Sequence, residues 1–508
     1  MDKPAGFTLF SLICVETGWI YAKSKELYIY FFRHPVYYYI RKTETFRLQS
    51  GSGQSRPAGR KAQRHDMSRK KIVFIGAGSF IFTRSLSRDI LTFDALRDAE
   101  LWLVDINPEH LEMARRMVQR YVDEGHYPAT VHCTMDRREA LPGADGVLCT
   151  IQVGGWEALK DEICIPAKYG IEAAIGDTRG VWGFFCYLRT VQAIVDIARD
   201  AMELCPNAVF LNYTNPMAML CRTVQTLFPD LNYIGLCHSV QETIMLLAKW
   251  LKADTKDMTY TCAGINHTAF YLTLKCRGED AYPMLRKIVD DPEIYKTERV
   301  RIEMFKHLGY FVTESSYHNS EYNGWFRKRD DLMMKYCPPW SWDDTPPKFM
   351  SQRFQEGRPL FGGRRRMDML EKWFSENITL DRGHEFASYI FNACFGDHTP
   401  FEFNGNVRNF HLIDNLPYGA CVEVPILADA NGCKPTHIGF MPRELALLNN
   451  IESQTEELAV EAYLNRDKSL IYKAVYYDPY TSAKLSLDEM DAMVDEMFAA
   501  CGKYHSFW

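Results

Sequence analysis

The sequence contains no run of 18 or more apolar residues, and a membrane-spanning helix requires a run of about that length. It also lacks a surplus of basic charge, because 59 lysine and arginine residues stand against 65 aspartate and glutamate residues, a net charge of −6. This balance is not typical of proteins that bind nucleic acids or anionic membranes. We therefore expect a small-molecule partner, with no nucleic acid and no membrane involved.

Paired CxxC motifs are also missing, since the fifteen cysteines are scattered singly along the chain. An odd number of cysteines in a long chain fits reduced thiols better than a framework of disulfides. Reduced thiols are typical of the cytoplasm, and we expect the protein to be located there.

The first 66 residues differ in character from the rest of the 508-residue chain. Basic and glycine-containing tracts alternate there with aromatic residues, without a sustained periodic pattern. The first apolar stretch, residues 7–15, is followed by Glu16 and has no clear cleavage site, so it is a poor signal peptide. Met67 directly precedes SRKKIVFIGAGS and would be a natural start. We expect residues 1–66 to be an extension without a functional role.

From Lys70 onward, short apolar runs alternate with amphipathic ones, the pattern of a parallel sheet covered by helices. Residues 107–121 and 188–203 carry apolar residues at helical spacing. The six expected strands cover residues 71–76, 100–106, 130–135, 145–151, 208–214 and 232–237. The sequence thus predicts an α/β fold, with a Rossmann-type doubly wound parallel sheet in residues 67–260 and an α+β catalytic and oligomerisation domain in residues 261–508.

A dinucleotide-binding turn is indicated by IGAGS at residues 75–79, which follows the first expected strand and precedes a helix. Gly76 and Gly78 would let the backbone approach a pyrophosphate, with Ser79 at the helix start. A third glycine is missing because Ile81 occupies its place. Asp105 ends the second strand, where a carboxylate accepts both ribose hydroxyls and repels a 2′-phosphate, which favours NAD over NADP. Alternatively, the glycines form only a tight turn and Asp105 caps the following helix.

A metal site is indicated by Cys237 and His267, which follow two apolar runs and stand 30 residues apart. A thiolate and an imidazole leave coordination positions open for substrate oxygens, as a catalytic metal requires. On their own the pair is weak evidence, because buried cysteines are usually inert and single histidines usually structural.

Six segments together resemble glycoside hydrolase family 4, most closely its α-galactosidases. They are IGAGS, NYTNPMAM (212–219), GLCHS (235–239), CAGINH (262–267), GYFVTESS (309–316) and GNVRNFHLIDNLPYGACVEVP (405–425). The resemblance extends from about residue 70 to the C-terminus. It implies an NAD- and Mn²⁺-dependent hydrolysis of α-galactosides, outside the two-carboxylate scheme of most glycosidases.

The mechanism that the resemblance implies is a redox-neutral elimination and addition. NAD⁺ takes hydride from the sugar C3, and the resulting ketone acidifies the proton at C2. A base removes that proton, the group at C1 leaves, water adds, and NADH returns its hydride. The metal stabilises the negative charge that develops during deprotonation.

The resemblance also assigns roles to individual residues. Cys237 and His267 match the two metal ligands, and Asn215 matches a substrate-binding asparagine. Tyr322 matches the tyrosine that acts as base, although Tyr310 and Tyr317 lie nearby in the sequence. A tyrosine needs a lowered pKa to act as base near neutral pH, and the metal is the expected cause.

Two further residues are catalytic candidates. Asp177 matches an acidic residue of the family's active site, which would protonate the leaving group or bind a sugar hydroxyl. His238 directly follows the ligand Cys237 and is expected to assist the leaving group.

The chain departs from the family pattern in two places. Relatives usually continue DTxGPGG, whereas residues 177–184 read DTRGVWGF, which predicts a narrower pocket beside the nicotinamide. Relatives also commonly carry arginine where His384 begins HEFAS (384–388). Because arginine is permanently charged and histidine is not, anion recognition there would be lost or become pH-dependent.

Other functions stay open at this point. Within the family, the substrate could be an α-glucuronide, an α-galacturonide or an α-glucoside. From a different class, an NAD-dependent dehydrogenase of the lactate or malate type shares the architecture of the first domain. A sugar or NAD sensor without turnover ranks last. By resemblance, we expect a homodimer or homotetramer.

Overall fold

The computed structural model describes residues 69–337, 350–357 and 363–504, together with the backbone of four strands near the N-terminus. The chain divides into two compact units, Met1–Met67 and Ser68–Trp508. In the first unit, an antiparallel sheet has the order β1-β2-β3-β4. Its strands are β1 (Leu12–Val15), β2 (Gly18–Lys23), β3 (Glu26–Phe31) and β4 (Ile40–Arg41). The remainder of the expected extension lies outside the described residues.

The second unit is built on a nine-stranded sheet of order β16-β15-β14-β10-β9-β8-β5-β6-β7. Six of its strands are parallel and confirm the predicted strands. They are β5 (Lys71–Ile75), β6 (Glu100–Val104), β7 (Thr130–Thr134), β8 (Gly146–Cys149), β9 (Val209–Asn212) and β10 (Tyr233–Gly235). Read from β7, their order is the doubly wound order 3-2-1-4-5-6, which confirms the Rossmann-type fold.

The later part of the chain adds strands to the same sheet. β14 (Phe401–Arg408) pairs antiparallel with β10, and β15 (Cys421–Asp429) and β16 (Gly432–Pro435) follow it. A separate antiparallel sheet contains β11 (Met258–Ala263), β12 (Phe270–Cys276) and β13 (Glu279–Asp280). Strands from both sides of residue 260 therefore share one sheet.

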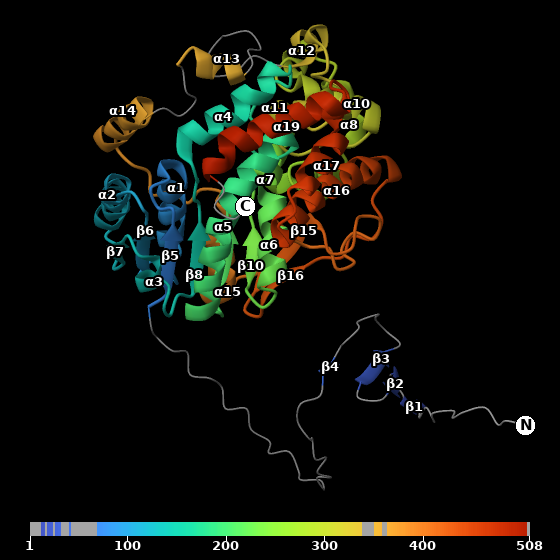
Figure 1. Ribbon diagram of the computed structural model, residues 1–508. Helices are drawn as coiled ribbons and strands as arrows, with labels where there is room; N and C mark the ends of the chain where they lie inside the picture. Colours follow the sequence, from blue (N-terminus) through green and yellow to red (C-terminus); the bar gives the residue numbers. More distant parts are fainter. Residues whose placement is uncertain are drawn as a thin grey trace, which may run out of the picture. The chain divides into compact units, whose positions relative to one another are not determined.

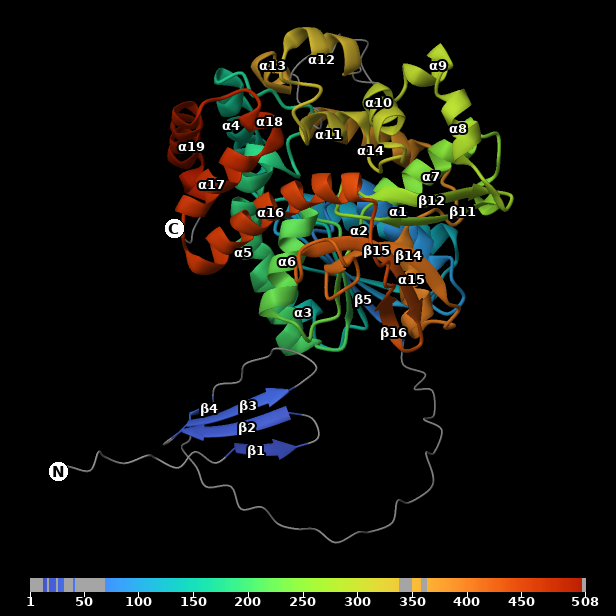
Figure 2. The same ribbon diagram turned by 90° about the vertical axis from the view of Figure 1, so that its right-hand side faces the viewer.

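Both faces of the large sheet are buried, because successive side chains of a strand point to opposite faces. Ile72 and Phe74 of β5 belong to one hydrophobic cluster, and Val73 and Ile75 belong to the other. Figure 1 and Figure 2 show helices on both sides of the sheet.

The first cluster includes side chains of α1 (Phe80–Leu91), α2 (Pro108–Glu124) and α15 (Phe386–Phe395). The second includes α3 (Arg137–Ala140), α4 (Gly155–Lys168), α5 (Gly180–Leu204), α6 (Met217–Leu227), α16 (Arg443–Asn465), α17 (Ser469–Tyr477) and α19 (Leu487–Cys501).

A third cluster joins α7 (Ser239–Trp250), α8 (Tyr282–Ile288) and α10 (Arg299–Leu308) to β11 and β12. The remaining helices are η1 (Thr255–Asp257), α9 (Pro292–Tyr295), α11 (Ser316–Glu321), α12 (Asp330–Tyr336), α13 (Met350–Gln355), α14 (Gly363–Ser375), α18 (Pro479–Ser482) and η2 (Gly502–Tyr504).

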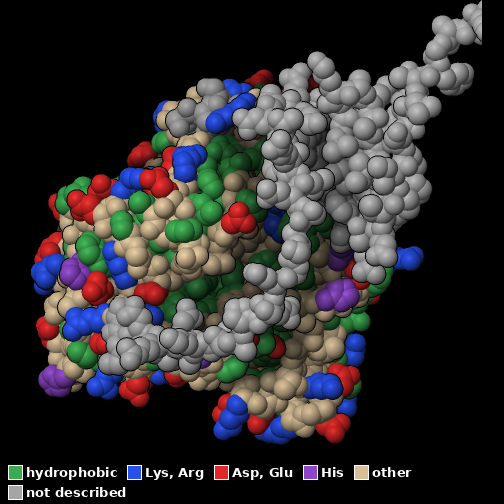
Figure 3. Space-filling view, turned by 90° about the horizontal axis from the view of Figure 1, so that it is seen from below, with side chains coloured by type: hydrophobic (Ala, Val, Ile, Leu, Met, Phe, Trp, Pro, Cys, Tyr) green, Lys and Arg blue, Asp and Glu red, His purple; other side chains and the backbone are tan. Residues whose placement is uncertain are grey.

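Helix α5 begins earlier than the predicted 188–203 and is the one helix in the described part of the chain that is long and apolar enough to cross a membrane. Of its most apolar window, 83% is buried inside the protein, where it packs against α4, α6 and α16. These contacts are those of a core helix. On the face seen in Figure 3, acidic and basic side chains of the described residues are interspersed, in keeping with the balanced composition.

Candidate active site at the carboxyl edge of the sheet

The predicted site residues gather at one edge of the large sheet. Gly76, Asp105, Asn215 and Cys237 each follow a parallel strand, namely β5, β6, β9 and β10. Parallel strands end at the same edge, and in doubly wound folds ligands bind outside this edge, at the point where the strand order reverses. Here the order reverses between β5 and β8.

Close packing explains both glycines of the turn after β5. Gly76 has a φ of +84°, and a Cβ there would lie 2.9 Å from the backbone nitrogen of Ile151. A Cβ on Gly78 would lie 2.5 Å from Asp105 Oδ2. The Gly78 N–H donates to that oxygen at 2.7 Å. The turn after β5 is thus tied directly to the carboxylate that follows β6.

Asp105 does not cap α2. Its Oδ1 accepts from the N–H of Asn107 at 2.9 Å, while the Asn107 side chain caps the helix by accepting from the N–H groups of Glu109 and His110. Ser79 is the N-cap residue of α1, and its side chain makes no capping hydrogen bond. The carboxylate of Asp105 therefore braces the glycine turn and stays half-buried at the sheet edge.

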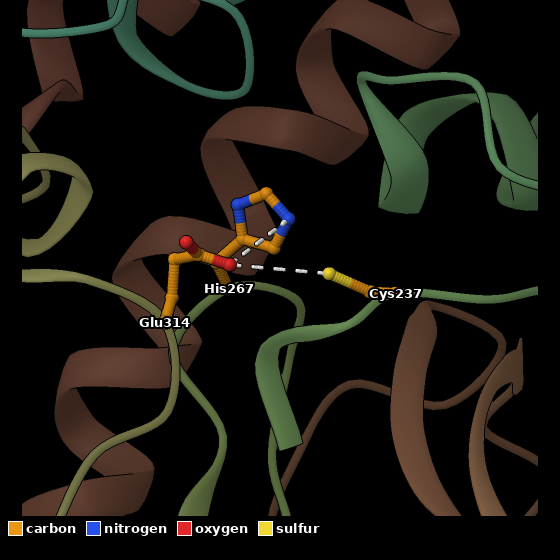
Figure 4. A group of neighbouring side chains, drawn as sticks. All are labelled: Cys237, His267 and Glu314. Atoms are coloured by element: carbon orange, nitrogen blue, oxygen red, sulfur yellow. Dashed lines mark hydrogen bonds and ion pairs between the residues drawn. The ribbon is translucent and has the colours of Figure 1, made fainter. Parts of the chain in front are cut away.

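Three side chains that could hold a metal ion converge beside this edge. The Sγ of Cys237 lies 4.0 Å from Oε2 of Glu314, and the same oxygen lies 3.9 Å from Nε2 of His267. The three donor atoms lie within 4.8 Å of one another and point toward one another in Figure 4. Cys237 follows β10, His267 lies between β11 and β12, and Glu314 precedes α11.

The electrostatics of this cluster suit a cation. Burial lowers the pKa of His267 to about 4, so its imidazole is neutral and has a lone pair to donate. Burial raises the pKa of Glu314, but the charge of His318 and its hydrogen bond outweigh that effect and hold the pKa well below the ordinary value. Burial, together with the carboxylates of Glu314 and Glu423, raises the pKa of the Cys237 thiol. A divalent ion would offset this concentration of negative charge.

Tyr322 contacts Nδ1 of His267, the ring nitrogen that does not face Glu314. Its hydroxyl is 3.2 Å from Nδ1 of His267, and Thr178 Oγ1 is 3.3 Å from that atom. Tyr322 is only 2% exposed, at the C-terminal end of α11. Burial raises its pKa well above the ordinary value, and the guanidinium of Arg179 opposes that rise.

A second histidine links Asp177 to the metal cluster. Nε2 of His318 lies 3.4 Å from Asp177 Oδ1, and its Nδ1 lies 3.3 Å from Glu314 Oε1. Burial raises the pKa of Asp177, but the hydrogen bond and charge of His318 outweigh it and hold that pKa at about 2. Asp177 is therefore ionised when no substrate is bound.

The loop that presents Asp177 is held from the side of α11. The buried carboxylate of Glu321 accepts hydrogen bonds from three successive backbone N–H groups, those of residues 174–176. Glu321 directly precedes Tyr322, so one short segment fixes both the tyrosine and the loop before Asp177.

His238 faces a different carboxylate. Its Nε2 lies 2.9 Å from Oε2 of Glu385, whose other oxygen accepts from Ser85 Oγ at 2.9 Å. Burial lowers the pKa of His238, but the hydrogen bond to Glu385 outweighs it and raises that pKa. The ring of Phe82 stacks on the imidazole with centroids 5.5 Å apart.

Asn215 presents an unused acceptor. Its Oδ1 is buried and has no hydrogen-bond partner among the described residues. A buried polar atom without a partner costs free energy, so a ligand hydroxyl at this position would be stabilised.

Sequence reasoning missed Glu314, His318 and Glu385. Glu314 stands in the motif GYFVTESS, has a φ of +64°, and is four residues from His318, but neither spacing nor residue type singles it out. Strained backbone of this kind concentrates at functional sites.

Three side chains of the unusual DTRGVWGF segment do not line the site. Val181, Trp182 and Phe184 each have an exposed fraction of 0% and pack in the core around α5. The expected narrowing of the pocket by these side chains is therefore not seen. His384, the second departure, is exposed.

Known proteins are similar to this chain over most of the second unit, Ser68–Trp508. Residues 71–253 match the family 4 glycosyl hydrolases, and residues 262–481 match their C-terminal domain. An alpha-galactosidase of Bacillus subtilis (strain 168) is 37% identical over 439 residues, which cover 86% of this chain and 99% of the relative. An alpha-galactosidase of Rhizobium meliloti (strain 1021) is 33% identical over 462 residues, with 86% and 89% covered.

Among solved structures, a 6-phospho-alpha-glucosidase from gut microorganisms in complex with NAD and Mn²⁺ superposes with a TM-score of 0.72 at 18% identity, covering 86% of this chain and 99% of that one. At this identity the match supports the fold alone. The two family matches and the identity to full-length relatives decide the assignment: this chain belongs to the family 4 glycosyl hydrolases.

Proposed function

We propose that the protein hydrolyses α-galactosides with the help of NAD and Mn²⁺. The observation that carries this proposal is the placement of three metal donors, Cys237, His267 and Glu314, next to the hydroxyl of Tyr322 at the ligand edge of a doubly wound sheet. A dehydrogenase of the lactate or malate type needs no thiolate-bound metal.

The residues present fit both groups. Gly76, Gly78, Ser79 and Asp105 would hold NAD, because a glycine turn between a strand and a helix suits a pyrophosphate, and the carboxylate that follows β6 stands where the ribose hydroxyls bind in folds of this type. The donors Cys237, His267 and Glu314 would hold Mn²⁺. When bound, NAD⁺ supplies a hydride acceptor, and the cation supplies positive charge beside the sugar oxygens.

Tyr322 is the proposed base that accepts the proton from the sugar C2. With Nε2 of His267 turned to the metal donors, the ring proton belongs on Nδ1, which faces the Tyr322 oxygen at 3.2 Å. A hydrogen bond donated to that oxygen stabilises the phenolate, as does the nearby guanidinium of Arg179. Both effects work against the rise in pKa that burial causes.

Asp177 and His238 are proposed to act on the leaving group and the sugar hydroxyls. Asp177 is ionised and paired with His318, so it is suited to accept a hydrogen bond from a hydroxyl. His238 keeps its proton more readily because of Glu385, which suits a donor to a leaving oxygen. Asn215 Oδ1 is the proposed acceptor for a further sugar hydroxyl.

An α-galactoside is the preferred substrate on two grounds. The relatives with 37% and 33% identity are alpha-galactosidases, whereas an alpha-glucosidase of Erwinia rhapontici has 28% and an alpha-galacturonidase of Lachnoclostridium phytofermentans has 27%. In addition, the carboxylates of Asp177, Glu314 and Glu385 already concentrate negative charge at the site, which disfavours the carboxylate of a uronide. Uronides remain the second candidate.

The deciding experiment is hydrolysis of p-nitrophenyl α-galactoside by the full chain with NAD⁺, Mn²⁺ and a thiol reductant, each omitted in turn. We expect release of p-nitrophenol to stop without NAD⁺ or without metal. Release that continues without NAD⁺ would contradict the oxidative mechanism. Activity restricted to p-nitrophenyl α-galacturonide would transfer the proposal to uronides, and NADH accumulation from malate or lactate would favour a dehydrogenase.

Four broader proposals accompany the main one. Residues 1–66 are an extension without catalytic role, since the family match begins at residue 71. Residues 67–260 are the NAD-binding domain, and residues 261–508 are the substrate domain. The protein works in the cytoplasm, because the cysteines of the described residues are free thiols.

It forms a homodimer or homotetramer, for which the exposed Phe410, Tyr418 and Phe440 offer apolar contact area. Light scattering of the full chain and of a 67–508 form would test oligomeric state and the extension together.

A further inference from the structure

Arg179 stands in the unusual DTRGVWGF segment, at the start of α5, yet its side chain reaches the active site rather than the core around that helix. It is 4% exposed, so nearly all of its guanidinium is removed from water. Such a charge is retained only where it is fully paired.

Its contacts bracket the metal ligand His267. Nη2 of Arg179 donates to the carbonyl oxygen of Asn266, and Nη1 donates to the hydroxyl of Thr268. One planar group thus holds the residue before the ligand and the residue after it.

The same guanidinium lies on the proposed base. Its central carbon is 4.9 Å from the centre of the Tyr322 ring, a cation–π distance. The tyrosine hydroxyl in turn lies 3.2 Å from Nδ1 of His267. Arg179 therefore contacts Tyr322 directly and holds His267 through the two residues on either side of it, while Tyr322 contacts His267 itself.

Two acids on α16 fix the guanidinium in this place. Glu456 Oε1 accepts from Nε of Arg179 at 2.7 Å, and Glu452 Oε2 accepts from Nη1 at 3.1 Å. Both acids are buried. A guanidinium presents its donors in a rigid fork, which a lysine ammonium cannot reproduce.

We propose that Arg179 is a positioning residue that sets Tyr322 and His267 at their working distance, so that the proton acceptor and the metal site move as one unit. The inference rests on the proposed roles of Tyr322 and His267. A displacement of about 1 Å at a reacting centre costs on the order of 100-fold in rate. A core ion pair with no such role would affect stability alone.

The test compares Arg179→Lys with Arg222→Lys. Arg222 of α6 also pairs with α16, through Glu457 at 2.9 Å, but makes no described contact with residues 266–268 or Tyr322. Both variants of the full chain are measured for thermal stability, for binding of Mn²⁺ alone by electron paramagnetic resonance, and for hydrolysis of p-nitrophenyl α-galactoside with hydrogen or deuterium at C2.

For Arg179→Lys we expect kcat to fall about 10- to 100-fold and the C2 isotope effect to be larger than in the parent. We also expect Mn²⁺ to bind about tenfold more weakly, which is the usual loss of affinity when a residue that orients a metal ligand is changed. For Arg222→Lys we expect all three quantities within about twofold of the parent. If Arg179→Lys lowers only the melting temperature and matches Arg222→Lys otherwise, the inference is overturned.

Should Arg179→Lys fail to fold, Thr268→Val removes a single contact of the guanidinium and Thr268→Ser restores the hydroxyl. We expect Thr268→Val to weaken Mn²⁺ binding and Thr268→Ser to recover it, whereas equal Mn²⁺ binding in both variants contradicts the inference. The Mn²⁺ titration needs no glycoside. A parent chain that binds Mn²⁺ but hydrolyses no α-galactoside would thus refute the proposed function while the effect of Arg179 on the metal site is still decided.

Discussion

The glycine turn and the metal cluster lie at the same edge of one sheet but are built in different ways. The turn, Gly76 to Ser79 with Asp105, comes from two neighbouring strands and is held by backbone contacts and one carboxylate. The metal cluster takes Cys237, His267 and Glu314 from separate segments, and the charge of His318 compensates the carboxylate of Glu314.

This difference predicts how each region responds to change. In the cluster, every charged side chain shifts the pKa of another, so the loss of one group leaves its partners uncompensated in a buried place. In the turn, a substitution causes a steric clash, and we expect the loss to be limited to cofactor affinity. We therefore expect the largest losses from the cluster and smaller, selective losses from the turn.

The largest effect is expected for Cys237→Ala, which removes a proposed ligand. Activity should fall at least about 1,000-fold, because electrostatic stabilisation by a metal contributes several kcal/mol and each 1.36 kcal/mol is a factor of ten. Steady-state hydrolysis and Mn²⁺ binding are the measurements. The exposed Cys133, changed to serine, is the thiol control and should keep full activity. Full activity in Cys237→Ala would contradict the whole site.

Tyr322→Phe comes next, since it removes the proposed base and leaves the donors in place. We expect kcat to fall about 100- to 10,000-fold, the usual contribution of general base catalysis, with NAD affinity unchanged. Tyr317→Phe is the control, because Tyr317 lies in the same segment and was an alternative by sequence. If Tyr317→Phe causes the greater loss, the base is misassigned.

A smaller and more selective effect is expected for Gly78→Ala. The added Cβ would lie 2.5 Å from Asp105 Oδ2 and 2.7 Å from Cβ of His110, so the turn must shift. We expect NAD to bind about tenfold more weakly, the loss of roughly one charge-assisted hydrogen bond, with Mn²⁺ binding intact. Gly502→Ala is the matched control, because nothing lies within 4 Å of that position. Calorimetry with NAD⁺ gives the affinity, and equal affinities in both variants would mean that the turn does not hold the cofactor.

The same contrast explains what could be predicted from the sequence. The strands and the glycine turn follow from local patterns, since apolar runs and the order of glycines and acid are visible in adjacent segments. The residues alone gave only weak evidence for Cys237 and His267 as a metal site, and the family resemblance assigned them as ligands. The role of Glu314 depends on its contact with the thiol of Cys237, 77 residues away, and the role of Glu385 depends on its contact with His238, 147 residues away. No local sequence pattern therefore reveals either residue.

The DTRGVWGF segment shows a case in which the sequence suggested the wrong side chains as lining the site. Its bulky residues look like pocket-lining groups in the sequence, but helix α5 turns Trp182 and Phe184 into the core, and Arg179 reaches the site instead. Which face of a helix start is buried depends on the packing of α16 and α18, which the segment itself does not encode.

The smallest effect is expected for His384→Arg, which restores the residue common in relatives. His384 is exposed, whereas its neighbour Glu385 is bound to His238, so an arginine there would add positive charge only at the rim of the site. An exposed ion pair contributes about 0–1 kcal/mol, so the ratio of α-galacturonide to α-galactoside hydrolysis should rise by no more than about fivefold. The gain should shrink as salt is added, because exposed charges are screened. A rise well beyond fivefold, or one insensitive to salt, would mean that residue 384 contacts the substrate directly and that the rim of the site, rather than the buried cluster, selects between neutral and acidic sugars.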